Sequence, residues 1–188
     1  ASEDEIGVLK TSAVYKYRFD ETENKKVFLS EVRRVSCPVK AGSIIISRMN
    51  APDLVGASGY VSDDKPNLFL PDRLWQARFN QNNKVVAQFI SKVLITHGLR
   101  GIIESIATGS SPSMKNISKG DLLNIYVALP PEREIEPILQ ELCMQEDSID
   151  TVILNQNEQI KLMREYKATL INSAVTGKIK ITPDMVEQ

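Results

Sequence analysis

The sequence has few of the residues on which enzyme active sites are usually built. It holds one histidine, His97, and two cysteines, Cys37 and Cys143, which share no ligand-like spacing. Neither a zinc site nor a disulfide framework is indicated, and His97 is expected to lie at a helix end rather than act as a general base. Glycine-rich phosphate loops and the Gly-x-Ser-x-Gly elbow of hydrolases are also absent. We therefore expect a binding and assembly module without a cofactor, not an enzyme.

Long hydrophobic runs are absent as well. The strongest, Gly42-Ser43-Ile44-Ile45-Ile46, is far too short to span a bilayer, and no secretory signal opens the sequence. We expect a cytoplasmic protein that does not enter a membrane. The sequence starts without methionine and soon enters a strand-like segment at Ile6, so we expect a truncated N-terminus.

A strong net charge is also absent, but the near-neutral total of −1 hides an uneven distribution. Residues 1–130 carry 17 basic and 13 acidic side chains, whereas residues 131–188 carry 6 and 11. Between Arg73 and Lys119, seven basic side chains face only Glu104. Such a stretch favours a polyanionic partner.

Residues 1–130 have the pattern of a small, mainly β, mixed domain. Strands are predicted at 6–9, 27–29, 43–47, 59–62, 74–79 and 122–129, separated by turn residues such as those of 63–67. Helices are predicted at about 83–97 and 99–107, because apolar residues recur there at three- and four-residue steps. Together with the helix described next, these elements predict an α+β fold.

Beyond Pro130-Pro131 the apolar residues follow the alternating four- and three-residue steps of a coiled-coil helix. The stripe consists of Ile135, Leu139, Leu142, Ile149, Ile153, Ile160, Met163 and Leu170, with Glu146, Gln156 and Lys167 at polar positions of the same seam. A helix over about 136–174 is roughly 55–60 Å long at about 1.5 Å per residue. Because a small domain cannot cover such a stripe, we expect the helix to pair with another helix.

The two ends of this helix carry different signals. Pro137 fits a first helical turn, so the helix either begins near Glu136 or kinks at the proline. At the other end, Thr176-Gly177-Lys178 predicts a stop with glycine in the left-handed conformation. A short strand-like tail is expected at 178–181.

Several segments resemble specificity subunits of type I restriction-modification systems. The combination that carries the resemblance is Ile117-Ser118-Lys119-Gly120-Asp121-Leu122-Leu123-Asn124-Ile125-Tyr126-Val127-Ala128-Leu129-Pro130-Pro131, then the heptad helix, then 165–179 (EYKATLINSAVTGKI). Segments 8–14 and 42–48, with Phe19-Asp20, are also similar to target-recognition domains of this family. The sequence departs from the family at 132–137, where Glu-Arg-Glu-Ile-Glu-Pro replaces the usual start of the helix.

The resemblance implies a non-catalytic subunit that recognises half of a bipartite DNA site. It implies a target-recognition domain at 1–130 and a conserved spacer helix with a short tail at 131–188. The implied partners are double-stranded DNA, methyltransferase subunits and, through them, the restriction subunit. The helix is expected to pair with a second specificity-subunit half or with a homodimer mate, as an antiparallel ruler between two recognition domains.

Candidate DNA-contacting residues come from three segments: a polar loop predicted at 108–116, the end of the strand at 43–47, and the strand at 74–79. They are Arg48, Asn50, Arg73, Gln76, Arg78, Ser110, Ser111, Ser113, Lys115 and Asn116. Arg48 and Asn50 combine a guanine reader with an adenine reader, whereas Lys84, Lys92 and Arg100 are expected to contact phosphates only. The competing interpretation is ordinary solvation of a loop and of strand ends, with Trp75 in the core.

Two other functions are weighed against DNA recognition. One is a structural adaptor that uses 132–174 as a coiled-coil dock and binds protein through its globular part. The other is a nuclease or methyltransferase domain, which the missing motifs disfavour: Leu129-Pro130-Pro131-Glu132 lacks the polar and aromatic residues of the adenine-methyltransferase motif.

Overall fold

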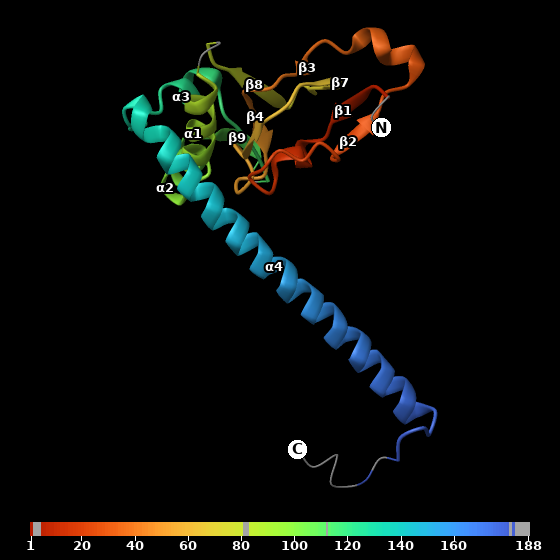
Figure 1. The fold of residues 1–188 in the computed structure, drawn as a ribbon. Helices are drawn as coiled ribbons and strands as arrows, with labels where there is room; N and C mark the ends of the chain where they lie inside the picture. Colours follow the sequence, from red (N-terminus) through yellow and green to blue (C-terminus); the bar gives the residue numbers. More distant parts are fainter. Residues whose placement is uncertain (2–4, 81–82, 112, 181, 183–188) are drawn as a thin grey trace. The chain divides into compact units, whose positions relative to one another are not determined.

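The fold is taken from a computed structural model that describes residues 1, 5–80, 83–111, 113–180 and 182. It is α+β, as predicted (Figure 1). The strands are β1 Gly7–Leu9, β2 Asn24–Lys26, β3 Pro38–Val39, β4 Ser43–Ser47, β5 Met49–Asn50, β6 Ser58–Val61, β7 Lys65–Phe69, β8 Leu74–Arg78, β9 Thr108–Ser111 and β10 Met114–Asn116. The helices are η1 Thr11–Val14, η2 Leu29–Arg34, α1 Lys84–Leu94, α2 His97–Ile106, α3 Lys119–Leu123 and α4 Glu132–Val175, where η denotes a 3-10 helix.

The described strands form three small sheets. Their strand orders are β2-β1-β7-β3, β6-β4-β8 and β5-β10-β9. All neighbouring pairs are antiparallel except β1 and β7, which run parallel. The sheet β5-β10-β9 continues directly from β4, because only Arg48 separates β4 from β5.

Strand β4 lies at the centre of the fold, and all five of its residues are buried. Side chains of a strand alternate between its faces, so the two faces of β4 enter two different cores. Ile45 packs with Leu9 and Leu74 in one core, whereas Ile44 and Ile46 pack with residues of α1 and α2 in the other. An unbroken apolar run is what a strand covered on both faces requires.

Several predicted elements are confirmed. The strands predicted at 6–9, 43–47, 59–62 and 74–79 correspond to β1, β4, β6 and β8, and the helices predicted at 83–97 and 99–107 to α1 and α2. Among them, β4 has an unbroken apolar run, whereas α1 and α2 have the three- and four-residue period of an amphipathic helix.

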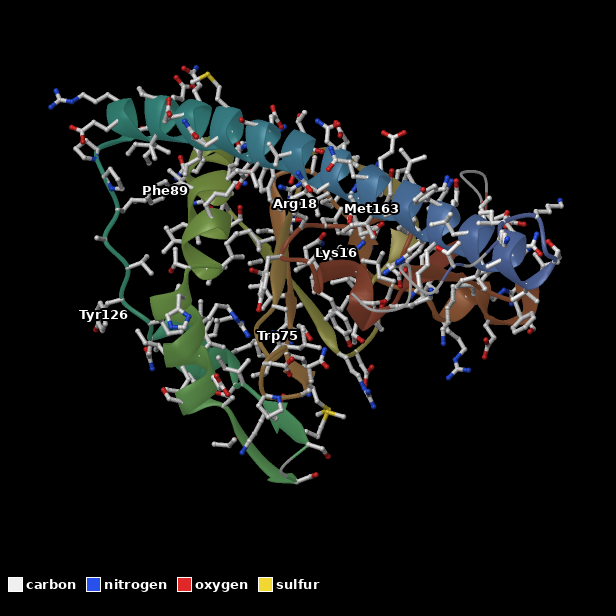
Figure 2. The ribbon with its side chains drawn as sticks, turned by 90° about the horizontal axis from the view of Figure 1, so that it is seen from below. Lys16, Arg18, Trp75, Phe89, Tyr126 and Met163 are labelled. Atoms are coloured by element: carbon white, nitrogen blue, oxygen red, sulfur yellow. The ribbon has the colours of Figure 1, made fainter. Side chains whose placement is uncertain are left out.

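The strand predicted at 122–129 is wrong. The segment starts in α3, because the Ser118 hydroxyl accepts a hydrogen bond from the Asp121 backbone N–H at 3.0 Å and caps a helical turn. Leu122 and Ile125 then face the second core, three residues apart as on a helix, while Leu123 and Tyr126 are exposed. Figure 2 shows Tyr126 pointing away from the ribbon.

Three other local predictions are also wrong. Strand β2 covers 24–26 rather than 27–29, and Phe28 and Leu29 are instead exposed at the start of η2. The turn predicted at 63–67 gives way to β7 at Lys65, and the loop predicted at 108–116 is largely the β9–β10 hairpin. Pairing with β1 sets the extent of β2, pairing with β1 and β3 forms β7, and pairing with β5 extends β10 into the predicted loop.

The long helix is present, but it starts earlier than predicted. Helix α4 begins at Glu132, so Pro137 lies inside it rather than in its first turn. A proline so close to the start removes a single backbone hydrogen bond, the one to Arg133. Ile135 and Leu139 are buried in this first part of the helix.

The end of α4 is as predicted. Gly177 has a φ of +71°, its N–H donates to the Ala174 carbonyl at 3.2 Å, and the Lys178 N–H donates to the Ser173 carbonyl at 2.8 Å. These bonds form a Schellman motif. The strand-like tail is not found at 178–180, and Ile181 lies outside the described residues.

The chain divides into two compact units, Ala1–Leu139 and Gln140–Gln188. The first turns of α4 thus belong to the first unit. The functional domain boundary at 130/131 stays a prediction. In the described part of the chain, no helix combines the length and apolar character needed to cross a membrane.

Candidate nucleic-acid interface

The sheet β5-β10-β9 brings together candidate residues that the sequence placed in two separate segments. Asn50 of β5 lies opposite Lys115 of β10, and Met49 lies opposite Asn116. On the other side of β10, Met114 lies opposite Ser111 of β9. The end of β4 and the 108–116 segment therefore form one surface rather than two.

A cluster of two cations around Trp75 adjoins this sheet. The Arg48 guanidinium carbon lies 5.7 Å from the centre of the Trp75 indole, and the Lys119 ammonium nitrogen lies 6.0 Å from it. Trp75 is half-buried and packs against the second core (Figure 2). We call Arg48, Trp75 and Lys119 the Trp75 cation cluster; cations held over an indole in this way are attracted by its π face.

Backbone hydrogen bonds fix the position of Arg48. Its N–H donates to the Arg73 carbonyl at 3.0 Å, and its carbonyl accepts from the Ile117 N–H at 3.0 Å. Arg48 thus sits where β8 and the end of β10 meet the β4–β5 connection. Its Nε, like Oδ1 of Asn116, is buried and has no hydrogen-bond partner in the described structure, so both atoms keep unused hydrogen-bonding capacity.

In the described structure, the basic side chains of this region have no acidic partner. Within the described ranges, no ion pair involves Arg48, Arg73, Arg78, Lys115 or Lys119. Arg73 precedes β8 at its Trp75 end and is exposed, whereas Arg78 pairs with Ser43 at the other end of β8. The structure therefore brings Arg73 to the cluster and leaves Arg78 away from it.

Asn50 is held inside the protein. Its Nδ2 donates to the Tyr15 hydroxyl and to the Ser47 hydroxyl, both at 3.1 Å, and its Oδ1 accepts from the Ala51 N–H at 2.9 Å. An asparagine that reads adenine needs both its amide oxygen and its amide nitrogen. The geometry thus gives Asn50 the task of anchoring β5.

Gln76 is occupied in a similar way. Its Oε1 accepts hydrogen bonds from the Lys40 N–H at 2.8 Å and the Ser43 hydroxyl at 3.1 Å, and its Nε2 donates to the Pro38 carbonyl at 3.2 Å. These bonds tie β8 to the segment around β3. Gln76 is therefore not brought together with the other candidates.

The serines lie near the tip of the β9–β10 hairpin. The hydroxyls of Ser111 and Ser113 lie 2.9 Å apart, and the Ser113 N–H donates to the Ser111 hydroxyl at 3.3 Å. Ser110 belongs to β9, but its side chain lies outside the described part of the structure. The hairpin thus presents small polar groups beside Lys115.

Comparison with known proteins identifies a relative of this chain. It is 32% identical over 131 residues to the type I restriction enzyme EcoEI specificity subunit of Escherichia coli. The chain belongs to the family of type I specificity subunits. The match covers 69% of this chain and 22% of that relative's length. No protein-family model matches the chain.

Two features of this family member escaped prediction from the sequence. Lys119 is not distinguished within the basic stretch. The core position that the sequence favours for Trp75 agrees with its packing against the second core, but its contact with two cations is not predicted. The register that places Ile46 opposite Trp75 links parts of the chain that are distant in sequence. The charge excess over 73–119 and the family-like segment 117–131 both include Lys119, but neither places it beside Trp75.

Metal ligands are not grouped at this surface. Across the ranges the structure describes, no three His, Cys, Asp or Glu side chains are arranged to hold a metal ion.

Proposed function

We propose that this chain recognises a sequence in double-stranded DNA, as the non-catalytic specificity component of a type I restriction-modification complex. The observation that carries the proposal is the Trp75 cation cluster beside the β5-β10-β9 sheet, in a chain that belongs to a specificity-subunit family. Cations without acidic partners are suited to phosphate contacts.

The residues divide into two roles. Lys119, Lys115 and Arg73 contact phosphates, which fixes the position of the duplex without reading its sequence. Arg48 reads a base edge, because the planar guanidinium can donate two hydrogen bonds to guanine. Stacking on Trp75 restricts the rotation of Arg48 before DNA arrives, so less side-chain entropy is lost on binding.

The proposed partners beyond DNA are methyltransferase subunits and, through them, the restriction subunit. In this complex the chain positions the catalytic subunits on one half of a bipartite site. The exposed apolar residues of α4 pair with another helix, either from a second specificity-subunit half or from another copy of this chain. Co-purification with a methyltransferase subunit tests the proposed contact between this chain and that subunit.

Duplex binding at several salt concentrations tests the DNA-recognition proposal, with duplexes selected from a randomised library. We expect binding that weakens steeply with salt, and a logarithmic salt slope that falls by about 0.9 in Lys119→Ala and in Lys115→Ala. Arg33→Ala removes the same charge from exposed η2 and is expected to leave binding unchanged. Absent or salt-insensitive binding, even with the methyltransferase subunit added, contradicts the proposal.

The exposed apolar side chains of α4 also favour a second candidate, a protein-binding adaptor. A protein-binding adaptor is expected to pair through α4 with another helix but to show no preference for any DNA sequence. The same measurements separate the two functions, because only DNA recognition predicts an effect of Lys119→Ala.

A further inference from the structure

We propose that Arg100 of α2 is a positioning residue for base reading by Arg48, because it holds the two segments that anchor the chain on either side of Arg48. The inference rests on the proposed function and explains how Arg48 keeps a fixed place at the Trp75 cation cluster. It gives Arg100 a role other than the phosphate contact expected from the sequence.

The guanidinium of Arg100 is directed into the protein. Its carbon lies 5.5 Å from the centre of the Tyr17 ring, and its Nη2 donates a hydrogen bond to the Asp53 carbonyl at 2.9 Å. Its Nη1 is buried and lies 3.0 Å from the position that a Cβ on Gly56 would occupy. A planar guanidinium can stack on an aromatic ring and donate hydrogen bonds at the same time. One side chain therefore connects α2 with the turn around Tyr17 and with segment 51–57, which follows β5.

Segment 51–57 anchors the chain before Arg48. The Gly56 N–H donates to the Ser47 carbonyl at 2.7 Å, and the Ala57 carbonyl accepts from the Ser47 N–H at 2.8 Å. Ser47 is the last residue of β4 and directly precedes Arg48. A fixed segment 51–57 therefore fixes the point at which the chain leaves the central strand.

The turn around Tyr17 anchors the chain after Arg48. The Tyr15 hydroxyl accepts a hydrogen bond from Nδ2 of Asn50, a residue of β5, at 3.1 Å. Tyr15 and Tyr17 belong to one turn, which is closed by a hydrogen bond of 3.1 Å from the Tyr17 N–H to the Val14 carbonyl. A fixed turn therefore fixes β5.

The backbone of Tyr17 supports the same role. Its φ is +56°, and among the described residues no other residue except glycine has a positive φ. A bulky side chain is rare in this conformation, which costs energy and persists only where surrounding contacts hold it. The Tyr17 ring packs on the core that contains Ile45 and also contacts Arg100. These contacts of the ring explain a tyrosine at a position that glycine would occupy without strain.

Arg100 is the residue that the two anchors share. Without its guanidinium, the bonds of Ser47 and Asn50 can still form, but the two segments that make them are no longer connected. We therefore expect β5 and β10 to open more often while β4 stays closed. The Arg48 carbonyl accepts from the Ile117 N–H at the end of β10, so this opening also releases Arg48. Base reading is lost in that state, because it needs donors held in one geometry.

Hydrogen exchange in the free 188-residue chain tests this clamp without DNA. Arg100→Met removes the guanidinium, and the amides of β5 and β10 are expected to exchange about tenfold faster, while those of β4 are unchanged. Tyr17→Leu removes the ring and is expected to give the same pattern. Tyr17→Phe keeps the ring, serves as the matched control and is expected to behave like the wild-type chain.

Duplexes selected from a randomised library test the consequence for recognition. In Arg100→Met the preference for the base pair that Arg48 reads is expected to fall about tenfold. The logarithmic salt slope is expected to stay the same, because no phosphate contact is lost. A phosphate contact by Arg100 would instead lower the slope by about 0.9 and weaken binding to all duplexes alike.

A double variant tests whether Arg100 and Tyr17 act together. Arg100→Met combined with Tyr17→Leu is expected to exchange and to bind as Arg100→Met does alone, because the second substitution removes a contact that is already lost. Additive effects of the two substitutions would contradict a shared clamp.

Three further outcomes would overturn the inference. They are unchanged exchange of β5 and β10 in Arg100→Met, equal acceleration of β4, which would indicate a general loss of stability, and a salt slope that falls by about 0.9. A base preference that survives Arg100→Met would refute the positioning role and leave the proposed DNA recognition intact. A wild-type chain that binds no duplex would contradict DNA recognition and, with it, the role of Arg100 in base reading, whatever the exchange pattern.

Discussion

Two cations that share one indole repel each other, and the described structure gives neither an acidic partner. Arg48 and Lys119 are therefore best stabilised when an anion approaches the Trp75 cation cluster. This arrangement depends on the register of β4 against β8. The sequence alone therefore predicts Arg48 as a candidate but not that Trp75 and Lys119 lie beside it. The same non-local contacts hold the amides of Asn50 and Gln76 in hydrogen bonds within the protein.

The two cations are expected to respond differently to substitution. Arg48→Lys keeps the charge but loses the two-donor fork, so we expect the preference for one base pair to fall by about 5- to 150-fold, corresponding to about 1–3 kcal/mol. Lys119→Ala is expected to weaken binding to all duplexes alike. Selection from a randomised duplex library, followed by affinity measurement on matched and mismatched sites, checks both. An unchanged preference in Arg48→Lys would remove Arg48 as a base reader.

At the scale of elements, the hydrophobic pattern of the sequence predicts the helices and strands whose tertiary contacts favour the same structure as their local sequence. The apolar run of β4 and the amphipathic faces of α1 and α2 each carry a signal of their own. The strand prediction at 122–129 is wrong because the apolar residues of this segment are also consistent with a helical turn. The cap at Ser118 stabilises that helical turn. Strands β5 and β10 have two and three residues, too few for any period to show.

Two glycines make a matched test of the connection between α2 and the segment that follows β5. Gly56 has a φ of +73°, and a Cβ there would lie 2.5 Å from Cγ2 of Ile103 in α2. Gly56→Ala is therefore expected to lower the free energy of unfolding by about 1–3 kcal/mol. Gly101, exposed on α2, has open space around it, and Gly101→Ala is expected to raise that free energy by about 0.5–1 kcal/mol.

Urea unfolding followed by circular dichroism measures both variants. Equal effects of the two substitutions would show that neither the positive φ of Gly56 nor the contact with Ile103 limits what position 56 can hold.

At the scale of the whole molecule, the helix pairing of the proposed function has a consequence for the target when the partner is another copy of this chain. A two-fold dimer carries two identical DNA-reading surfaces in opposite orientation. When DNA recognition and pairing with another copy act together, the preferred site is an inverted repeat of one half-site, separated by a fixed spacer.

Site selection with a monomeric variant tests this consequence. Ile153→Asp places a charge in the middle of the exposed apolar stripe of α4 and is expected to abolish the pairing of two copies. The variant is expected to select a single half-site and to bind the inverted repeat on the order of a hundredfold more weakly than the wild-type chain, because the second contact is no longer intramolecular. Equal affinity of both proteins for the repeat would show that only one copy contacts DNA.

The burial of β4 on both faces also has a consequence in time. A strand that is hydrogen-bonded on both sides and buried on both faces releases its amide hydrogens to solvent only when the whole unit opens. Ile44, Ile45 and Ile46 should therefore be among the last amides to exchange with deuterium, whereas the edge strand β9 should exchange much sooner. Arg48 follows directly on β4, the strand expected to open most slowly. We therefore expect the backbone of Arg48 to stay in place during local opening of the neighbouring β9–β10 hairpin.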